Sequence, residues 1–597
     1  MAKKIVLSSN AEEVAKSRYY NNGEDWEGCC RRVSEAVASV EKDKIGYAEK
    51  FGEMIYNMDF LPAGRILRNA GSHINASLLN CYVLPVDDSI ESIGKLLSET
   101  LQLHSEGGGV GCNYSLLRPK GDPIMGKGGN SSGMVSFIKA SDHVSKTIES
   151  GGQRRAASLA CCDVSHPEII DFINAKMVDK ELSQVNISVL INEKFIRCVE
   201  NDEIWTFKFN QKEYGKMHAK EIWDLIVKNM VKYAEPGILN STNLFKNNSW
   251  YYDPVICTNP CGEAVLENYG SCCLGSLVLP SFITGNINTN WKKLENTIKL
   301  AIRFLDNVID VNRYSLKDIE MKAKNSRRIG LGILGLAEYL FAKQLRYGSK
   351  EAIDEIEKLM RFIRDTAYET SIELSVEKGS FPKFEPNMYG NSSFVRKLPA
   401  QLRMKIKNKG VRNVTVLSMA PTGTIALLTN NTGGIEPLFH KAYLRKDRIS
   451  ERIYIHPKYR DLILSGNSIP DWFVSSGDLS MRDHLETQSI IQHYTDGSCS
   501  KTINAPKGTT TTQVNDLLLE YIRDLKGITI YVDGAKSGQV YNSLTEEEVF
   551  DIIAKETIGV NNNVDISDVE CNCQKSQDDT EDNGEQTCNI KNEEEVN

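Results

Sequence analysis

Hydrophobic and polar residues first follow a helical spacing. From residue 1 to about 75, charged and apolar residues are mixed at intervals of three to four positions, as in EVAKSRYY and GYAEKFGEMIYNM. This spacing is typical of amphipathic helices. We therefore predict an N-terminal helical cap over residues 1–75.

From Leu79 onward, short β-rich runs alternate with helical stretches. The runs include NCYVLPV, SQVNISVLI, EIWTFKF, VTVLSMA and GITIYVD, and the helical stretches include KKLENTIKLAIRFLDNVIDV and EAIDEIEKLMRFIRDTAYETSIELSVEKG. Strands that alternate with helices predict parallel α/β layers. Because no linker rich in Pro, Gly or Ser divides them, we predict one large α/β catalytic domain over residues 76–564.

The pattern stops near the C-terminus. Residues 565–597 are acidic and contain no aromatic side chain, so they cannot bury enough apolar surface to order themselves. We predict a disordered tail that carries Cys571, Cys573 and Cys588. These are either incidental thiols or a tethered group that exchanges with a disulfide in a cleft. Zinc is disfavoured, because three thiolates without a nearby histidine leave a tetrahedral site one ligand short.

Charge and cysteine usage exclude several classes. The 597 residues carry a formal net charge of -8, which argues against a nucleic-acid or acidic-membrane partner. No run of 18 apolar residues and no signal peptide is present, so a cytoplasmic location is expected. The 15 cysteines are spread thinly, which favours reduced thiols over a disulfide scaffold.

The richest chemistry lies in Asn259-Pro260-Cys261-Gly262-Glu263, followed by the adjacent thiols of Cys272 and Cys273. If the first stretch is extended, residues two apart share a face. The amide of Asn259, the thiol of Cys261 and the carboxyl of Glu263 would then point into one space. The sequence therefore predicts a reaction site here.

Three glycine-containing segments are candidates for ligand binding. SEGGGVGCNYS either brings backbone close to a ligand or forms a plain tight turn. APTGTIALL follows a β-like run, and strand, loop and helix-like run in this order are typical of a phosphate site at a helix N-terminus. GLGILG (330–335) matches GxGxxG, but polar and basic residues precede it instead of a buried strand. We therefore favour close helix packing there over a dinucleotide site.

Several motifs in one order carry a family resemblance. They are LPAGRILRNAG, NCYVLPVDDSIESI, EGGGVGCNYSLLRPKG, SGGQRRAASLACCDVSHPEI, NPCGE, SCCLGSL, RRIGLGILGLAE, APTGTIALLTNNTGGIEPLF and LKGITIYVDGAKSGQV. With them the chain resembles the large catalytic subunit of ribonucleotide reductases, most closely the adenosylcobalamin-dependent class II enzymes. The resemblance implies a ten-stranded α/β barrel that reduces ribonucleotides to 2'-deoxyribonucleotides for DNA synthesis. It also implies adenosylcobalamin as cofactor, with cobalt as the only metal.

The resemblance also assigns catalytic roles. Cys261 is expected to become a thiyl radical that removes the 3' hydrogen of the ribose. Glu263 takes the 3'-hydroxyl proton, and Asn259 hydrogen-bonds the reacting hydroxyl. A carboxylate within hydrogen-bond reach is a competent general base.

Two further cysteines are expected to supply electrons. Cys81 matches one of the family's redox pair, and register in SCCLGS selects Cys272 as the other. Cys273 stands where the family usually has Asn, and it is either an inert neighbour or interferes with thiol exchange. The tail thiols would restore the pair and would themselves be reduced by thioredoxin or glutaredoxin. Because Cys571 and Cys573 are closely spaced, Cys588 is an alternative partner.

The resemblance extends to nucleotide sites. Diphosphates are preferred over triphosphates as substrate, and a homodimer with allosteric choice among substrates is implied. Asp88 matches the acid that holds the ribose of a nucleoside triphosphate specificity effector, although it could instead cap the helix SIESIGKLLSE. The segment 151–160 resembles the loop that relays effector identity. The substrate site is expected to comprise Asn80, Cys81, Gly109, Asn259, Pro260, Cys261, Gly262, Glu263, Pro421, Thr422, Gly423, Thr424 and Ile425, with residues 421–424 on the phosphates.

The radical source separates two classes that share this barrel. Class I large subunits receive the radical through two adjacent tyrosines, but here Val532 follows Tyr531, which breaks such a relay. We therefore favour class II. The alternatives are a class I large subunit that needs a separate metal radical subunit, and a catalytically silent nucleotide-binding homologue. The chain also begins too close to the barrel for the ATP-binding regulatory domain of many relatives, so shut-off by dATP is not expected.

Overall fold

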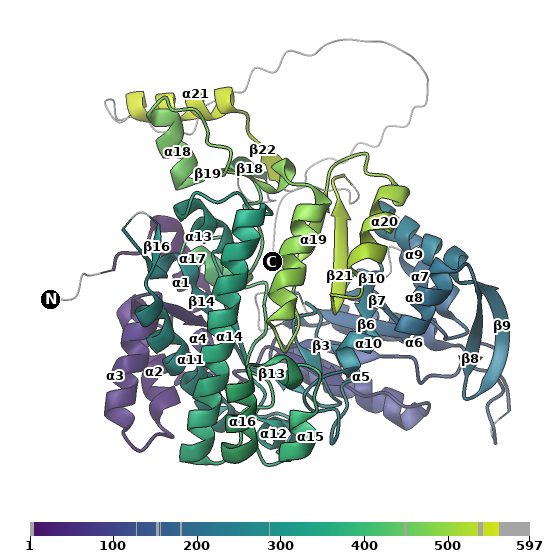
Figure 1. Ribbon diagram of the computed structural model, residues 1–597. Helices are drawn as coiled ribbons and strands as arrows, with labels where there is room; N and C mark the ends of the chain where they lie inside the picture. The colour runs from purple at the N-terminus through teal and green to yellow at the C-terminus, as the bar shows by residue number, and fades with distance from the viewer. Residues whose placement is uncertain are drawn as a thin grey trace, which may run out of the picture.

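The computed structural model describes residues 5–126, 128–150, 154–155, 157–178, 182–285, 287–446, 451–534 and 541–559. The predicted N-terminal helices are present (Figure 1). Phe60–Pro62, however, forms a strand, β1, that pairs antiparallel with β14 (Leu274–Val278). The helical region is therefore joined to a sheet. Its helices are α1 (Ser9–Arg18), α2 (Trp26–Ala38), α3 (Lys44–Tyr56) and α4 (Gly64–Asn69).

An eight-stranded sheet forms the larger part of the core. Its order is β13-β2-β3-β6-β7-β10-β21-β20. The five strands from β2 to β10 are parallel, whereas β21 runs antiparallel to β10 and parallel to β20. The parallel α/β layers expected from the sequence are thus present. The bounds are β2 (Cys81–Leu84), β3 (Gly109–Asn113), β6 (Ser158–Asp163), β7 (Val185–Ile191), β10 (Gly237–Asn240), β13 (Ser271–Cys272), β20 (Thr502–Ala505) and β21 (Gly527–Val532).

A second sheet has the order β1-β14-β17, with β17 spanning Gly330–Leu334. The run VTVLSM, expected as a strand, makes only single parallel bridges, Leu331 to Leu417 and Met419 to Cys499. It lies between β17 and the segment that leads into β20. Residues 414–419 therefore connect the two sheets.

The expectation of helix packing at GLGILG is wrong, because this run is strand β17. A Cβ atom at Gly330 would lie 2.5 Å from the Ser418 Cβ, and one at Gly332 would lie 2.6 Å from the Ser418 carbonyl oxygen. Real Cβ atoms do not approach other atoms so closely. The glycines are thus required for strand packing, and no dinucleotide turn is formed.

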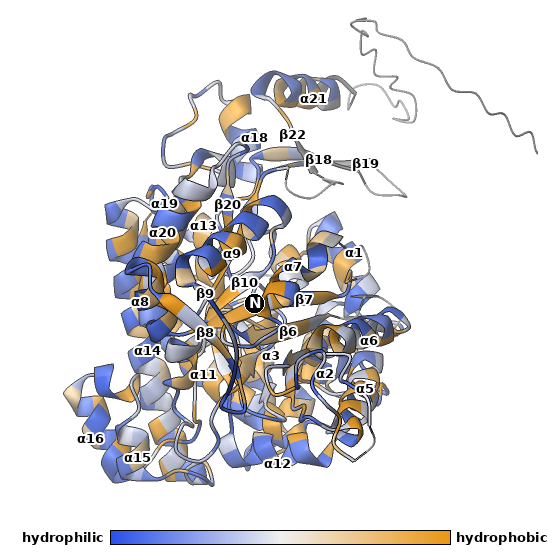
Figure 2. Cartoon of the chain, turned by 90° about the vertical axis from the view of Figure 1, so that its right-hand side faces the viewer, coloured by the Kyte–Doolittle hydropathy of each residue, from blue (hydrophilic) through white to orange (hydrophobic). Residues whose placement is uncertain are grey.

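Helices surround the sheets and turn polar residues outward. Figure 2 shows largely hydrophilic residues on outer helices such as α12 and α16. The two longest helical predictions are confirmed as α11 and α14, which pack on each other. The helices around the sheets include α5 (Ile90–Ser105), α6 (Met134–Lys146), α7 (Ile169–Val178), α8 (Glu193–Glu200), α9 (Ala219–Tyr233), α11 (Trp291–Val311), α12 (Lys317–Ser326), α13 (Leu336–Ala342), α14 (Lys350–Lys378), α16 (Ala400–Lys409), α19 (Met481–His493) and α20 (Thr511–Tyr521).

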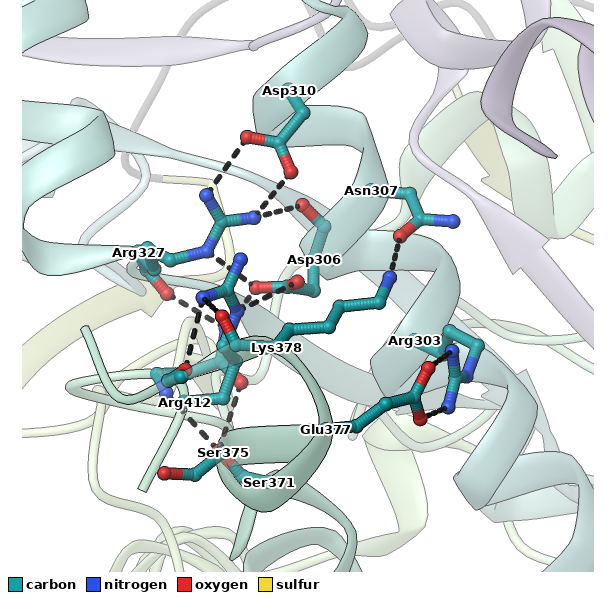
Figure 3. A network of polar contacts seen from close by, with 12 residues as sticks. Arg303, Asp306, Asn307, Asp310, Arg327, Ser371, Ser375, Glu377, Lys378 and Arg412 are labelled. Atoms are coloured by element: carbon teal, nitrogen blue, oxygen red, sulfur yellow. Dashed lines mark hydrogen bonds and ion pairs between the residues drawn. The ribbon is translucent and has the colours of Figure 1, made fainter. Parts of the chain in front are cut away.

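A buried ionic network ties α11 to its neighbours (Figure 3). Asp306, on α11, accepts hydrogen bonds from Arg327 Nε at 2.7 Å, Arg412 Nε at 3.1 Å and Asn413 Nδ2 at 2.9 Å. Arg327 also forms a bidentate pair with Asp310. Bidentate arginine–carboxylate pairs fix geometry well, so the network fixes α11 relative to Arg327 and the 412–413 segment.

A smaller lobe lies at the top of the molecule in Figure 1 and was not predicted. It has its own apolar cluster, which includes Leu438, Tyr459, Phe473 and Val549. The elements of the lobe are β18 (Ala442–Lys446), β19 (Glu451–Ile455), α18 (Pro457–Leu464), β22 (Tyr541–Ser543) and α21 (Glu546–Gly559).

No helix among the described residues is both long and apolar enough to cross a membrane.

Candidate active site

A short β-hairpin carries the central chemistry. Its strands are β11 (Cys257–Thr258) and β12 (Val265–Leu266), and residues 259–264 form the connecting turn. The backbone N–H of Asn259 donates to the Ala264 carbonyl at 3.1 Å, and the backbone N–H of Ala264 donates to the side-chain Oδ1 of Asn259 at 3.0 Å. Gly262 has a φ of 82°, which glycine adopts without strain. The stretch is therefore a turn and not the extended segment that the sequence analysis assumed.

The glycines of EGGGVG position this hairpin. A Cβ atom at Gly111 would lie 2.0 Å from the Thr258 carbonyl oxygen, and one at Gly109 would lie 3.2 Å from Pro260 Cγ. Strand β3 and the hairpin can approach each other only because these positions lack side chains. The close approach expected at these glycines thus serves the hairpin backbone.

A cavity of about 510 Å³ opens beside the hairpin. It brings together segments that are far apart in the sequence, from Arg18 to Ile425. Asn259 and Gly262, which were expected to contact substrate, are not among its lining residues. The predicted residues that do line it are Asn80, Cys81, Gly109, Pro260, Cys261, Glu263, Pro421, Thr422, Gly423, Thr424 and Ile425.

Cys261 differs from every other cysteine in the described part of the chain. Its residue is exposed at the cavity, whereas the other eleven described cysteines are buried. A group that enters the cavity can therefore reach this thiol directly.

Glu263 carries a buried carboxyl group whose desolvation is only partly offset. The residue is 2% exposed, and its Oε2 has no hydrogen-bond partner among the described residues. Burial raises the pKa of Glu263 to about 7, and the nearby Asn259 amide offsets part of the rise. A carboxyl whose pKa lies near neutral pH can both accept and return a proton.

Two more polar atoms around the cavity lack partners in the described structure. They are Asn259 Nδ2 and Asn80 Oδ1, and both are buried. Buried polar groups in folded proteins are nearly always hydrogen-bonded. Asn80 and Glu263 line the cavity, so Asn80 Oδ1 and Glu263 Oε2 are suited to the hydroxyl groups of a bound ligand, whereas Asn259 is not a lining residue.

Cys81 and Cys272 face each other across the antiparallel pair of β2 and β13. Burial, followed by the neighbouring Cys81 thiol, raises the pKa of Cys272. Cys273 points the other way, with its Sγ 3.4 Å from the Leu305 carbonyl oxygen on α11. Successive side chains of a strand alternate between faces, so Cys272 is placed for exchange with Cys81 and Cys273 is not.

The 421–425 loop ends in a short helix, α17 (Gly423–Leu428). The Thr422 hydroxyl accepts a 2.8 Å hydrogen bond from the Gly434 N–H. A Cβ atom at Gly433 would lie 2.5 Å from the Pro421 carbonyl oxygen. The glycine pair 433–434 therefore packs against the loop and fixes it at the cavity.

Three arginines at the cavity were missed by the sequence analysis. Arg18 comes from α1, and Arg65 and Arg68 come from α4. Helix α1 packs against α17, and Arg65 donates to the carbonyls of Glu106 and Gly107. The motif LPAGRILR already contained two of the three, but nothing in it indicated which way they point. The N-terminal helices thus supply a positively charged wall.

Asp88 lies outside the cavity. It accepts hydrogen bonds from the Arg118 N–H at 3.1 Å and from Arg118 Nε at 2.7 Å. Its alternative role as a helix cap is wrong, because the Ser89 hydroxyl caps α5 by accepting from the Ser92 N–H. Cys571, Cys573, Cys588 and, within the expected relay loop, residues 151–153 and 156 lie outside the described residues.

Comparison with known families accounts for both parts of the chain. The model for "Ribonucleotide reductase, barrel domain" matches residues 79–531, and the model for "Ribonucleotide reductase, all-alpha domain" matches residues 6–74. The chain belongs to the ribonucleotide reductase family. The order of helices and sheets described above is thus that of a reductase large subunit, with its all-α region ahead of its barrel domain.

Individual relatives of this reductase divide by name. A vitamin B12-dependent ribonucleoside-diphosphate reductase of Mycobacterium tuberculosis (strain CDC 1551 / Oshkosh) is 34% identical, over 90% of this chain and 81% of the relative. A vitamin B12-dependent ribonucleoside-diphosphate reductase of Thermoplasma acidophilum is 32% identical, over 92% of this chain and 74% of the relative. A ribonucleoside-diphosphate reductase subunit alpha of Chlamydia trachomatis is 25% identical, over 80% and 52%.

Proposed function

We propose that this protein is an adenosylcobalamin-dependent ribonucleoside-diphosphate reductase that supplies 2'-deoxyribonucleotides for DNA synthesis. The observation that carries the proposal is that the exposed Cys261 and the buried Glu263, whose Oε2 has no hydrogen-bond partner among the described residues, line one cavity with Cys81. The two relatives matched over most of both chains are named as vitamin B12-dependent. Val532 follows Tyr531 on β21, which disfavours a class I relay. The presence of each catalytic group disfavours a silent homologue.

The reaction follows from the groups at the cavity. The Cys261 thiyl radical takes the 3' hydrogen atom, so that an S–H bond forms as the C3'–H bond breaks. Glu263 accepts the 3'-hydroxyl proton, and Asn259 hydrogen-bonds that hydroxyl. The 2'-hydroxyl leaves as water, and the Cys81 and Cys272 thiols supply two electrons and two hydrogens to become a disulfide. Cys261 then returns its hydrogen to C3'.

The cofactor must reach Cys261. When bound, adenosylcobalamin supplies the radical chemistry. Gly108 and Ala157 line the same cavity as Pro260 and Cys261 and present little side chain there. We infer that these small residues would leave room for the cofactor at the thiol.

Nucleotide recognition is divided between two places. Residues 421–424, with Arg18 and Arg68 at the same cavity, would hold the substrate diphosphate, because anions favour cationic side chains and helix N-termini. Asp88 would hold the ribose of a nucleoside triphosphate effector at the interface of a homodimer. The tail cysteines would accept electrons from thioredoxin or glutaredoxin. Nucleic-acid and membrane partners are not proposed.

The two sheets are consistent with a ten-stranded barrel. One half would be β2, β3, β6, β7 and β10, and the other would be β14, β17, residues 414–419, β20 and β21. We retain a helical region at 1–75, the barrel domain at 76–564 and a redox tail at 565–597. In this arrangement the hairpin 257–266 lies within the barrel, where solvent is restricted.

Replacement of Cys261 by Ser tests the proposal. Serine keeps the size of the side chain but cannot form a comparable radical, so turnover should be abolished while nucleotide binding, measured by calorimetry, persists. Cys198→Ser is the matched control, because Cys198 lies on α8, away from the cavity, and it should retain turnover. Deoxyribonucleotide formation by Cys261→Ser would show that the radical assignment is wrong.

A further inference from the structure

The backbone of Glu263 is held from two sides, although its Oε2 has no hydrogen-bond partner among the described residues. Its carbonyl oxygen accepts hydrogen bonds from Ser418 Oγ at 2.7 Å and from the Ser498 N–H at 2.9 Å. These two backbone contacts therefore help to fix where the carboxyl points. Both come from outside the hairpin.

Lys526 holds the segment that supplies the second of these donors, the Ser498 N–H. Its Nζ donates to the Asp496 carbonyl at 2.7 Å and to the Gly497 carbonyl at 2.5 Å. Both carbonyls immediately precede Ser498. A Cβ atom at Gly497 would lie 2.5 Å from the Leu417 carbonyl oxygen, so this turn has little room to move.

Asp496 holds the other segment. Its carboxylate accepts from the N–H groups of Val416 at 2.9 Å and Leu417 at 2.8 Å, and from the Tyr368 hydroxyl at 2.7 Å. Ser418 follows directly. One buried residue thus connects both donors to Glu263, since its carbonyl binds Lys526 and its carboxylate binds the 416–417 backbone.

We propose that Lys526 and Asp496 are positioning residues for Glu263, acting through the Ser498 N–H and the Ser418 hydroxyl. A general base works only within hydrogen-bond reach of its proton, and misplacement by about 1 Å costs on the order of 10²-fold in rate. Lys526 and Asp496 together form a clamp that sets the position of the base without touching the substrate. The proposal rests on the proposed function, in which Glu263 takes the 3'-hydroxyl proton.

Lys526→Met tests the clamp in the full-length enzyme with adenosylcobalamin, dithiothreitol and a ribonucleoside diphosphate. We expect kcat to fall on the order of 10²-fold with little change in KM. The acid limb of the kcat profile should move down by about one pH unit, because a looser Glu263 is better hydrated and ionises at lower pH. Lys526→Arg, which retains the donors, should recover most of the lost kcat.

Lys293→Met is the matched control, because Lys293 similarly holds Asp59 at 2.5 Å and the Ser281 carbonyl at 3.1 Å, away from the cavity. It should leave kcat and its pH profile unchanged. If Lys526→Met gives the same kcat and profile as Lys293→Met, the clamp is refuted.

Ser418→Ala removes one direct contact with the Glu263 carbonyl and serves if Lys526→Met does not fold. It should lower kcat and move the same limb, and wild-type behaviour would also refute the clamp. Glu263→Gln separates the two proposals. If it is inactive while the clamp variants behave normally, only the clamp fails; if it turns over normally, the role of Glu263 itself is wrong.

Discussion

Two buried carboxyls in this reductase have opposite surroundings. Asp306 in the α11 network is 0% exposed, and Glu263 at the cavity is 2% exposed. Burial alone would raise both pKa values, but Arg327 and Arg412 reverse this effect and lower the pKa of Asp306. Glu263 has no such partner, and its pKa rises to about 7.

The difference separates stability from reactivity. A paired buried charge becomes costly when one partner is removed, so the α11 network contributes to holding the barrel domain together. An uncompensated carboxyl costs stability but can exchange a proton near neutral pH. The carboxyl at the cavity therefore lowers the free energy of unfolding locally, whereas the paired carboxylate of the network does not.

The Glu263→Gln variant should have the largest effect and tests the contrast between the two carboxyls most directly. Glutamine keeps the shape of the side chain but cannot accept the 3'-hydroxyl proton, so kcat should fall by about 10²- to 10⁴-fold. The unfolding temperature at pH 7 and above should rise, because a buried acid whose ionisation costs stability has been removed. Steady-state kinetics and calorimetry check both. Turnover within a few-fold of the wild type would remove Glu263 from the mechanism.

Asp306→Asn should have the opposite outcome. It leaves Arg327 and Arg412 buried without their shared carboxylate, which should cost about 3–5 kcal/mol in the free energy of unfolding. On the same helix, Glu295→Gln disrupts a surface pair with Lys299 and should cost less than about 1 kcal/mol. Denaturant unfolding measures both. Equal losses in the two variants would contradict a structural role for the network.

The pH dependence of stability should sharpen the contrast. The pKa of Glu263 is raised from an ordinary value of 4.5 to about 7, so its contribution is present below pH 4.5 and is lost as pH rises through 7. Asp306 has a lowered pKa, so its contribution is lost as pH falls through that value. Glu263→Gln should remove a decrease of up to about 3 kcal/mol between pH 4.5 and 7. An unchanged slope in denaturant unfolding would contradict the raised pKa.

The sequence predicted many of the groups at the cavity, although it missed the three arginines, and it did not predict their geometry. Cys261 and the 421–425 loop stand in motifs whose residue types carry chemistry, whereas Cys81 was expected from the family resemblance. The turn at 259–264 was missed because Gly262 permits a positive φ that a strand pattern does not reveal. Strand β17 was missed because polar residues of α12 precede a run that is buried only by distant segments.

Orientation was the other gap. A helical period shows that α1 has two faces but not that Arg18 turns toward the cavity, since this depends on how α1 packs on α17. Likewise, alternation alone distinguishes Cys272 from Cys273 but does not tell which of them faces Cys81. Pairing of β13 with β2 decides this. Contacts between segments far apart in the sequence fix such choices.

The most direct test of the account uses the purified protein with adenosylcobalamin, dithiothreitol and a ribonucleoside diphosphate, and no second protein. Chromatographic measurement should show deoxyribonucleotide formed with turnover that depends on the cofactor. No product under these conditions, together with activity restored by a separate metal-containing radical subunit, would contradict the class II assignment.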